Sequence, residues 1–217
     1  YVNKVFAVNT PTTKFINKYF GLEKALLLPN CIDNIKNYVF KDKGKFNKTF
    51  TIGAMGRLVN KKGFDFLINA CKQLKDVNLI LAGDGPLIDL YKKDTNQFKN
   101  IKLLGWIKNK NNFFNKLDLF CSCSTVEPFG IVIIEAMARG IPVISTKCNG
   151  PLDIIKPNFN GLFIEKDNII QLKNYIKKFK KDRTILKKFS KNGINEYKRK
   201  YTLNAYSKKF FYLLDKI

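Results

Sequence analysis

The sequence predicts an α/β fold: a Rossmann-like parallel sheet with helices on both faces, followed by C-terminal helices. From residue 50 to about residue 146, short apolar, β-rich runs alternate with amphipathic stretches of helical spacing. After residue 165 only helical patterns remain. Strand, helix and strand at this spacing imply right-handed crossovers, and therefore a mostly parallel sheet.

Five strands are expected, and they alternate with helical or polar stretches. The strands are expected at residues 49–56, 77–83, 101–106, 117–124 and 140–146. The stretch after the first strand has apolar residues at helical spacing, namely Phe64, Leu67, Ile68, Cys71 and Leu74. A helical segment follows the turn GDGP and runs to Phe98. Three last helices are expected near residues 168–181, 183–198 and 203–216.

The first part of the chain has a different pattern from the rest. It contains a strand-to-helix turn and then a second strand, which ends in the turn PNCID at residues 29–33. We expect residues 1–48 to be the tail of a preceding element and a linker into the sheet. Residues 49–200 would form the Rossmann-like domain, and residues 201–217 a separate last helix.

The composition argues against several classes of protein. Hydrophobic residues make up 45% of the 217 residues, and no stretch approaches the roughly 18 uncharged apolar residues of a membrane span. No signal peptide is visible, and the chain opens on Tyr1, which suggests a piece of a longer protein. Histidine, the commonest metal ligand and general base, is absent. The five cysteines have no disulfide-like spacing, and we interpret them as buried thiols in a reducing cytoplasm.

The net charge of +23 arises from 40 basic and 17 acidic residues, and nearly all the basic ones are lysine. A bias toward lysine and asparagine along a whole chain often reflects the base composition of the coding DNA. Only four arginines are present, so the clustered arginine of nucleic-acid binders is missing, and we expect no nucleic-acid partner. The lysine-rich stretch 166–200 suits an anionic membrane surface, but solvated helix faces explain it better.

Ligands of open α/β sheets bind beyond the carboxyl ends of the strands, so the loops there are the candidate sites. The loop after the first strand carries Arg57, and Lys61 and Lys62 lie near the next helix start. A guanidinium, an ammonium and helix N–H groups together suit a diphosphate. A solvated loop explains Lys61 equally well, but it explains Arg57 less well.

Two other loops have weaker signals. Gly83 and Gly85 allow either a tight turn or a close ligand approach. The sole tryptophan, Trp106, leaves a strand and could line a base pocket, although a rim or core position is equally compatible.

The stretch EPFGIVIIEAMARGIPVIST at residues 127–146 is the most informative one. Pro128 suits the first turn of a helix, and Gly130 lets a ligand approach the exposed amides there. Glu135 would then lie about two turns inside the helix, roughly 12 Å beyond Glu127 along its axis. This arrangement suits a nucleotide-diphosphate sugar, with the sugar at Glu127, the ribose at Glu135 and the diphosphate between them. A helix cap would also explain Glu127, but Glu135 lies in an apolar run where an unpaired carboxylate is costly.

This stretch, followed by NGPLDIIKPNFNGLFIE, closely resembles the signature of the retaining GT-B glycosyltransferases that use nucleotide-sugar donors. Further landmarks follow in the family's order: PNCID at 29–33, GRLVNKKGFDFLINA at 56–70, LAGDGP at 81–86 and LLGW at 103–106. The resemblance covers about residues 1–200. It implies the C-terminal, donor-binding half of a GT-B fold.

The resemblance also implies roles for individual residues. The catalytic residues would be Arg57 and Lys62, which bind the donor diphosphate, and Glu127, which binds the transferred sugar. The remaining substrate-binding residues would be Glu135 on the ribose, backbone amides at Phe129, Gly130 and Ile131, the base pocket near Trp106 and Ile107, and Gly83 and Gly85. No cofactor or metal is expected, because the two cations and a helix N-terminus would stabilise the leaving diphosphate.

Two departures from the family pattern stand out. Cys31 occupies the usual glycine position of the turn PNCID, which we take to be remote from the donor contacts. The chain also matches only the second of the family's two domains, so the helix at 201–217 would pack back on an N-terminal domain of which 1–48 keeps a remnant.

The expected function is therefore donor binding in a retaining transfer of sugar to a glycan or lipid-linked acceptor, in envelope polysaccharide biosynthesis. The alternative is a non-catalytic nucleotide-sugar-binding module or a subunit of a split enzyme. We expect UDP- or GDP-linked sugars as ligands and a cytoplasmic location, with peripheral membrane contact as an option. The third interpretation is a basic protein that binds a nucleic-acid duplex or a membrane surface through charge alone.

Overall fold

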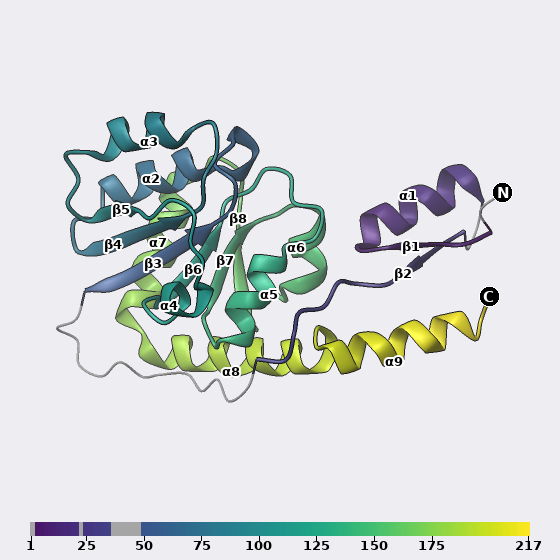
Figure 1. The fold of residues 1–217 in the computed structure, drawn as a ribbon. Helices are drawn as coiled ribbons and strands as arrows, with labels where there is room; N and C mark the ends of the chain where they lie inside the picture. The colour runs from purple at the N-terminus through teal and green to yellow at the C-terminus, as the bar shows by residue number, and fades with distance from the viewer. Residues whose placement is uncertain (1–2, 22–23, 36–48) are drawn as a thin grey trace.

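The computed structural model describes residues 3–21, 24–35 and 49–217, and it confirms the predicted α/β fold class (Figure 1). Its centre is a six-stranded parallel sheet in the order β5-β4-β3-β6-β7-β8. The strands are β3 (Phe50–Met55), β4 (Val77–Ala82), β5 (Ile101–Leu103), β6 (Leu119–Ser122), β7 (Val143–Thr146) and β8 (Gly161–Ile164). Chain order reverses between β3 and β6, and such a switch point is where open sheets bind ligands.

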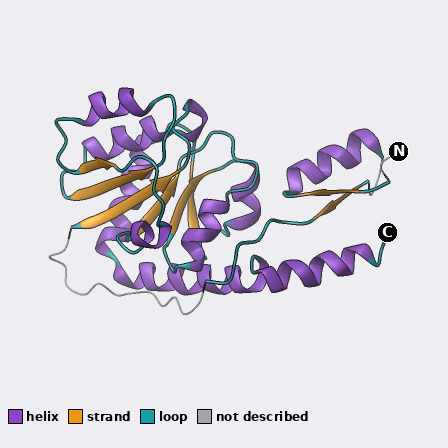
Figure 2. Ribbon diagram, in the orientation of Figure 1, coloured by secondary structure: helices purple, strands orange, loops and turns teal. Residues whose placement is uncertain are grey.

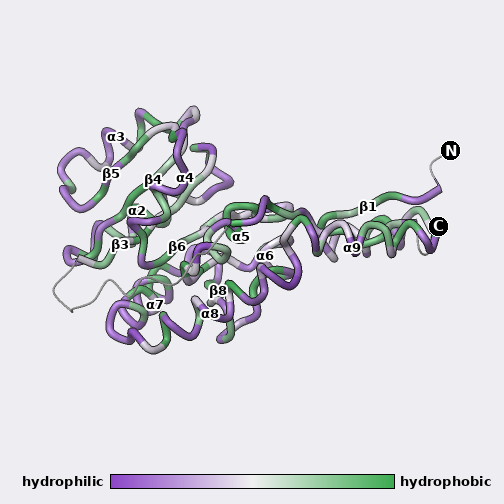
Figure 3. The backbone as a smooth tube through the Cα atoms, turned by 60° about the horizontal axis from the view of Figure 1, so that its bottom comes forward, coloured by the Kyte–Doolittle hydropathy of each residue, from purple (hydrophilic) through white to green (hydrophobic). Residues whose placement is uncertain are grey.

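The sheet is covered on both faces, as expected for parallel strands (Figure 2). In β6, Leu119 and Cys121 belong to one hydrophobic core, whereas Phe120 belongs to the other. The first core is covered by α2 (Phe64–Lys72) and α7 (Ile169–Lys181), and the second by α5 (Ile131–Ala138) and the end of α8 (Arg183–Lys200). Figure 3 shows hydrophobic stretches along the strands and hydrophilic ones on the outer turns. The shorter elements are η1 (Asn60–Lys62), α3 (Ile88–Thr95), α4 (Lys110–Phe114) and α6 (Asn149–Ile154).

The three C-terminal helices, α7, α8 and α9 (Leu203–Leu214), begin within one residue of the predicted positions. Their side-chain caps explain these starts. Asn168 accepts a hydrogen bond from the Gln171 amide, and Asp182 accepts one from the Thr184 amide. Thr202 caps α9 in the same way, so each helix start has one of its unpaired amides satisfied.

The sheet differs from the prediction at its two edges. The edge strand β5 ends at Leu103 instead of residue 106, because Gly105 has a φ of 65° and its carbonyl accepts from the Gly83 amide. At the other edge, β8 and the preceding α6 were not predicted. Strand β8 has only four residues and begins with Gly161, and glycine is disfavoured in strands.

A separate small unit precedes the sheet, and we call it the N-terminal unit. It consists of β1 (Val5–Ala7), α1 (Thr10–Phe20) and β2 (Ala25–Leu27), with β1 and β2 paired in parallel. Helix α9 runs alongside this unit (Figure 1), and the rings of Phe6 and Phe210 lie 5.6 Å apart. The predicted strand, helix and strand of this region are therefore present. The proposed domain boundaries at 48 and 200 remain predictions, and residues 36–48 lie outside the described part.

Three of the cysteines lie in the first core and are buried. Burial raises the pKa of the Cys71 thiol to about 12, and burial together with neighbouring thiols raises that of Cys121 well above its usual range. These thiols therefore stay protonated, in agreement with their interpretation as core residues. Within the described residues, no helix is long and apolar enough to cross a bilayer.

Candidate functional site

The loops that follow β3 and β6 meet at the switch point of the sheet. The Thr125 amide donates to the Lys61 carbonyl at 2.8 Å, which joins the two loops. Gly63 has a φ of 60°, and a Cβ there would lie 2.2 Å from the Cys123 carbonyl oxygen. The two loops thus pack backbone against backbone, and any larger residue at 63 would separate them.

An ion pair joins the same two loops through predicted site residues. Lys62 Nζ lies 2.5 Å from Glu127 Oε2, and the two side chains are 21% and 11% exposed. The Ser124 hydroxyl lies 3.5 Å from the same carboxylate oxygen, and the Gly150 amide donates to the Glu127 backbone carbonyl at 2.9 Å. The structure therefore brings Lys62 and Glu127 together and gives Glu127 a role other than a helix cap.

Helix α5 begins at Ile131, three residues later than the sequence suggested. Pro128 is not in its first turn, because Gly130 has a φ of 105° and cannot belong to a right-handed helix. Only about 6 Å of helix rise then separates Ile131 from Glu135, so the helical basis of the 12 Å estimate is wrong.

The start of α5 has no side-chain cap, since Gly130 occupies the N-cap position. The first amides of a helix have no intrahelical acceptor and carry the positive end of its dipole. The Phe129 side chain is buried, and its ring packs edge-on against Tyr201 at 6.1 Å. Phe129 can therefore offer a ligand only its backbone, and the ligand contacts of residues 129–131 stay predictions.

Glu135 is buried and incompletely bonded. It is 8% exposed, and Lys110 Nζ lies 2.7 Å from its Oε1 atom. Its Oε2 atom has no hydrogen-bond partner among the described residues. Arg139 lies one turn further along but donates to the Glu135 backbone carbonyl and to Asn111. A buried carboxylate oxygen without a donor is costly, and such an exception needs an explanation.

A cavity of about 350 Å³ adjoins Glu135. Cys31 and Asp33, from the turn PNCID, line it together with Glu135 and Arg139. The expectation that this turn is remote from the site is therefore wrong. The turn is held there because the Ile32 amide donates to the carbonyl of Tyr201 at the end of α8.

The two glycines of the turn GDGP pack against the loop that follows β3. A Cβ at Gly83 would lie 1.9 Å from the Gly56 carbonyl oxygen, and one at Gly85 would lie 2.7 Å from that of Leu58. Close chain packing thus accounts for both glycines, and contact with a ligand stays a prediction.

The remaining predicted residues lie at the periphery. Arg57 is exposed directly after β3. Trp106 is 79% exposed, whereas Ile107 packs against the second core. Their contacts with a ligand stay predictions.

Residues that the sequence did not single out also contribute to the site. They are Lys110, Ser124 and Gly150. In a lysine-rich chain, the sequence around Lys110 has no feature that distinguishes it from the other lysines.

Cys148 also lies near Glu127 and Lys62, and burial raises the pKa of its thiol above the usual 9.0 despite a hydrogen bond with Thr146. The thiol therefore stays protonated at neutral pH. Among the described residues, no group of three or more cysteines and carboxylates could hold a metal ion.

Comparison with known proteins identifies the family. The model of the family "Glycosyl transferases group 1" matches residues 36–196. This chain belongs to that glycosyltransferase family. The family prediction is therefore confirmed.

Individual relatives agree with this assignment. The lipopolysaccharide core biosynthesis glycosyltransferase LpsE of Rhizobium meliloti is 31% identical over 160 residues, which cover 70% of this chain and 47% of the relative. The UDP-Gal:alpha-D-GlcNAc-diphosphoundecaprenol alpha-1,3-galactosyltransferase of Escherichia coli is 30% identical over 196 residues, covering 82% of this chain and 50% of the relative. The chain thus spans about half the length of these curated relatives.

A solved structure shows the same fold. HepE of Anabaena, in complex with UDP-glucose, superposes with a TM-score of 0.87 at 23% identity. The superposition covers 99% of this chain and 64% of HepE. The Rossmann-like fold expected for one half of a GT-B protein is therefore present.

Proposed function

We propose that this chain is the donor-binding part of a retaining glycosyltransferase. It would transfer a sugar from a nucleotide-diphosphate sugar to a glycan or lipid-linked acceptor in envelope polysaccharide biosynthesis. The relatives named for lipopolysaccharide core biosynthesis and for a diphosphoundecaprenol acceptor support this substrate class. The UDP-glucose complex of HepE supports the nucleotide sugar as the donor.

One observation carries the proposal: two buried glutamates flank the uncapped start of α5. Glu127 lies before the helix and is paired with Lys62, and Glu135 lies inside it with one carboxylate oxygen that has no partner in the described part of the chain. A carboxylate accepts hydrogen bonds from sugar hydroxyls, and helix amides bind phosphate. In this proposal Glu127 binds the transferred sugar, Glu135 the ribose, and the amides of residues 129–131 the diphosphate between them.

The other predicted residues complete the same ligand. Arg57 and Lys62 bind the diphosphate, and Trp106 and Ile107 lie against the base. The glycines of GDGP let the chain approach the nucleotide closely.

The chemistry follows from these positions. The bond between the sugar anomeric carbon and the diphosphate oxygen breaks, and the acceptor hydroxyl oxygen forms the new bond to this carbon from the same face. The hydroxyl proton passes to the leaving diphosphate oxygen. Arg57, Lys62 and the α5 amides stabilise the leaving diphosphate, so the proposal includes no metal or cofactor. Glu127 orients the sugar and is not a covalent nucleophile.

Calorimetric titration tests the donor site. The wild type would be titrated with UDP, GDP and their common sugar conjugates, beside the variants Arg57→Ala and Glu135→Ala. Saturable binding with a preference for one base, lost in both variants, supports the proposal. Glu165→Ala is the matched control, because Glu165 is an exposed glutamate that is paired with one lysine, Lys147, and is not among the proposed site residues.

Absence of nucleotide binding by a chain shown to be folded would contradict the proposal for this chain.

The second candidate is a non-catalytic nucleotide-sugar-binding module or one subunit of a split enzyme. Donor binding without sugar transfer by the chain alone, and transfer after addition of a second subunit, would identify it. In either case we propose a cytoplasmic location, with the lysine-rich α7 and α8 available for peripheral contact with anionic lipid.

A further inference from the structure

The short loop that carries Glu127 is held from three sides. We call residues 127–130 the donor loop. The Gly150 amide, at the start of α6, donates to the Glu127 carbonyl, and the Phe129 ring packs against Tyr201. The third contact comes from the N-terminal unit, where Asn9 Nδ2 donates to the Pro128 carbonyl at 2.5 Å.

Asn9 is fully engaged at both ends of its side chain. Its Oδ1 atom accepts from the Thr12 amide at 2.7 Å and so caps α1, while its Nδ2 atom bonds to Pro128. The residue is only 1% exposed although it is polar. The next amide, that of Thr10, donates to Asp153 Oδ2 in α6 at 2.5 Å. The turn before α1 is therefore bonded both to the donor loop and to the helix that supports it.

The donor loop needs such support because it has no regular structure of its own. Its last residue has a left-handed backbone, and residues 127–130 belong to no helix or strand. An irregular segment is held in one conformation by the side chains that satisfy its backbone groups. Asn9 is the donor for the Pro128 carbonyl, and this carbonyl lies between Glu127 and the first amides of α5.

We infer that Asn9 is a positioning residue for donor binding. It holds the donor loop so that Glu127 and the α5 amides face the same nucleotide sugar. The inference rests on the proposed function for the identity of the ligand, but not for the contact itself. Through Asn9, the placement of the N-terminal unit and the affinity for the donor become coupled, and such coupling acts in both directions.

Two substitutions remove the hydrogen bond from Asn9 to the Pro128 carbonyl and keep the one that caps α1. Asn9→Asp and Asn9→Ser both keep an oxygen that can cap α1, since Asp and Ser are as good as Asn at this position. Neither provides the N–H donor to Pro128, and in Asn9→Asp a carboxylate oxygen would face the carbonyl. The matched control is Asn168→Asp, because Asn168 caps α7 by the same bond and is not part of the site.

The first measurement is hydrogen exchange of the unliganded chain. Amides of residues 129–133 are expected to exchange about tenfold faster in Asn9→Asp and Asn9→Ser, the factor for one lost hydrogen bond. Amides in β6 and β7 should be unaffected, and the control should match the wild type throughout. Unchanged exchange at 129–133 in both variants would overturn the inference whatever ligand the chain binds.

The second measurement is affinity for the nucleotide sugar that the wild type binds best among UDP-glucose, UDP-galactose and GDP-mannose. Both variants are expected to bind it about tenfold more weakly, with a smaller loss for the free nucleoside diphosphate, because Glu127 contacts only the sugar. Unchanged affinity of both variants for the nucleotide sugar would contradict the positioning role. If the wild type binds none of the probes, the proposed function fails, and the exchange data still decide whether Asn9 holds the loop.

Discussion

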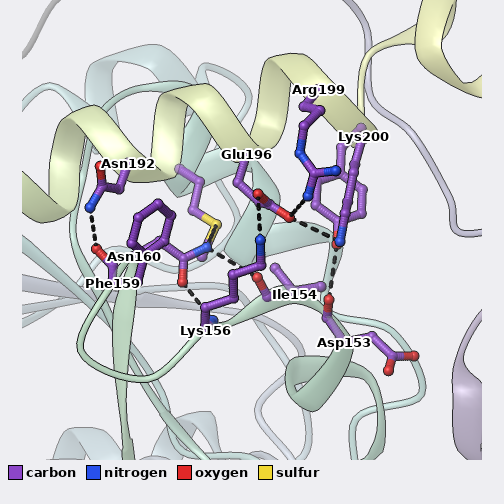
Figure 4. Close-up of polar contacts among 11 residues, drawn as sticks. Asp153, Ile154, Lys156, Phe159, Asn160, Asn192, Glu196, Arg199 and Lys200 are labelled. Carbon is purple, nitrogen blue, oxygen red and sulfur yellow. Dashed lines mark hydrogen bonds and ion pairs between the residues drawn. The ribbon is translucent and has the colours of Figure 1, made fainter.

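Two glutamates in this chain are buried to a similar extent but are bonded very differently. Glu196 in α8 is 4% exposed, and Glu135 in α5 is 8% exposed. Glu196 is paired with three cations: Lys156 at 3.2 Å, Arg199 at 2.7 Å and Lys200 at 2.9 Å (Figure 4). Glu135 has one lysine, and its second oxygen has no partner in the described part of the chain.

The difference separates a carboxylate that is fully bonded within the fold from one that we propose to bind a ligand. Glu196 ties α8 to the segment after α6, where Asn160 donates to the Ile154 carbonyl and Asn192 to that of Phe159 (Figure 4). Burial raises the pKa of Glu196, but hydrogen bonds from Lys200, Arg199 and Lys156 outweigh it, so the pKa lies below its usual 4.5. Both carboxylate oxygens of Glu196 are bonded within the fold, whereas Glu135 Oε2 has no partner among the described residues, and in our proposal the ligand supplies one.

Glu135→Ala should produce the largest effect on binding. Loss of two charge-assisted hydrogen bonds to ribose hydroxyls is expected to weaken nucleotide-sugar affinity about 100-fold. The free energy of unfolding should change by less than about 0.5 kcal/mol, because the variant also removes an unpaired buried oxygen. Calorimetry and urea denaturation measure the two quantities. A large loss of stability with unchanged affinity would place Glu135 in the same class as Glu196.

Glu196→Gln should show the opposite pattern. Without the carboxylate, three cations surround a neutral side chain, and the free energy of unfolding is expected to fall by about 2 kcal/mol. Donor affinity should stay within a factor of two, since neither Glu196 nor its three cations belong to the proposed donor site. The control Glu165→Gln, at an exposed glutamate with one lysine, should change stability by less than about 0.5 kcal/mol.

The pH dependence of stability sharpens the comparison further. Because the pKa of Glu196 is lowered on folding, its contribution is fully present above the unfolded value of 4.5 and is lost as pH falls through the lower folded pKa. The stability gap between wild type and Glu196→Gln should therefore shrink below pH 4.5. Urea denaturation between pH 7 and pH 3 measures it, and a constant gap would contradict the ion-pair account.

The smallest expected effects come from two equally exposed lysines. Lys156 is one of three cations on Glu196 and Lys110 is the single one on Glu135, and both side chains are 49% exposed. Lys156→Ala should cost about 0.5 kcal/mol of unfolding free energy, since two cations remain. Lys110→Ala should cost about 1 kcal/mol, because it leaves a buried carboxylate with no cation. The reverse order in thermal denaturation would show that Glu135 has further partners.

The sequence predicted the parts of the fold that follow from local patterns. Helices α7, α8 and α9 have helical periodicity and the caps Asn168, Asp182 and Thr202 at their starts. Strand β8 was missed because it is short and begins with Gly161, and glycine is disfavoured in strands. The start of α5 was misplaced because Pro128 suits a first helical turn, and only the backbone angle of Gly130 shows that the helix begins later.

For the site, the sequence predicted the residues that follow strands but not those that arrive from elsewhere. Lys62 and Glu127 follow β3 and β6, which are neighbours at the switch point, so topology brings them together. Lys110 and Asn9 reach the site through long-range packing. In a chain with 24 asparagines and abundant lysine, neither residue differs in the sequence from its many counterparts.

A crystal structure of the chain with its preferred nucleotide sugar would test the central claim most directly. The account predicts the diphosphate against the amides of residues 129–131 and a ribose hydroxyl within hydrogen-bond distance of Glu135 Oε2. Glu196 should keep its three cations unchanged. A nucleotide sugar bound elsewhere, with Glu135 Oε2 still unpaired, would contradict the account.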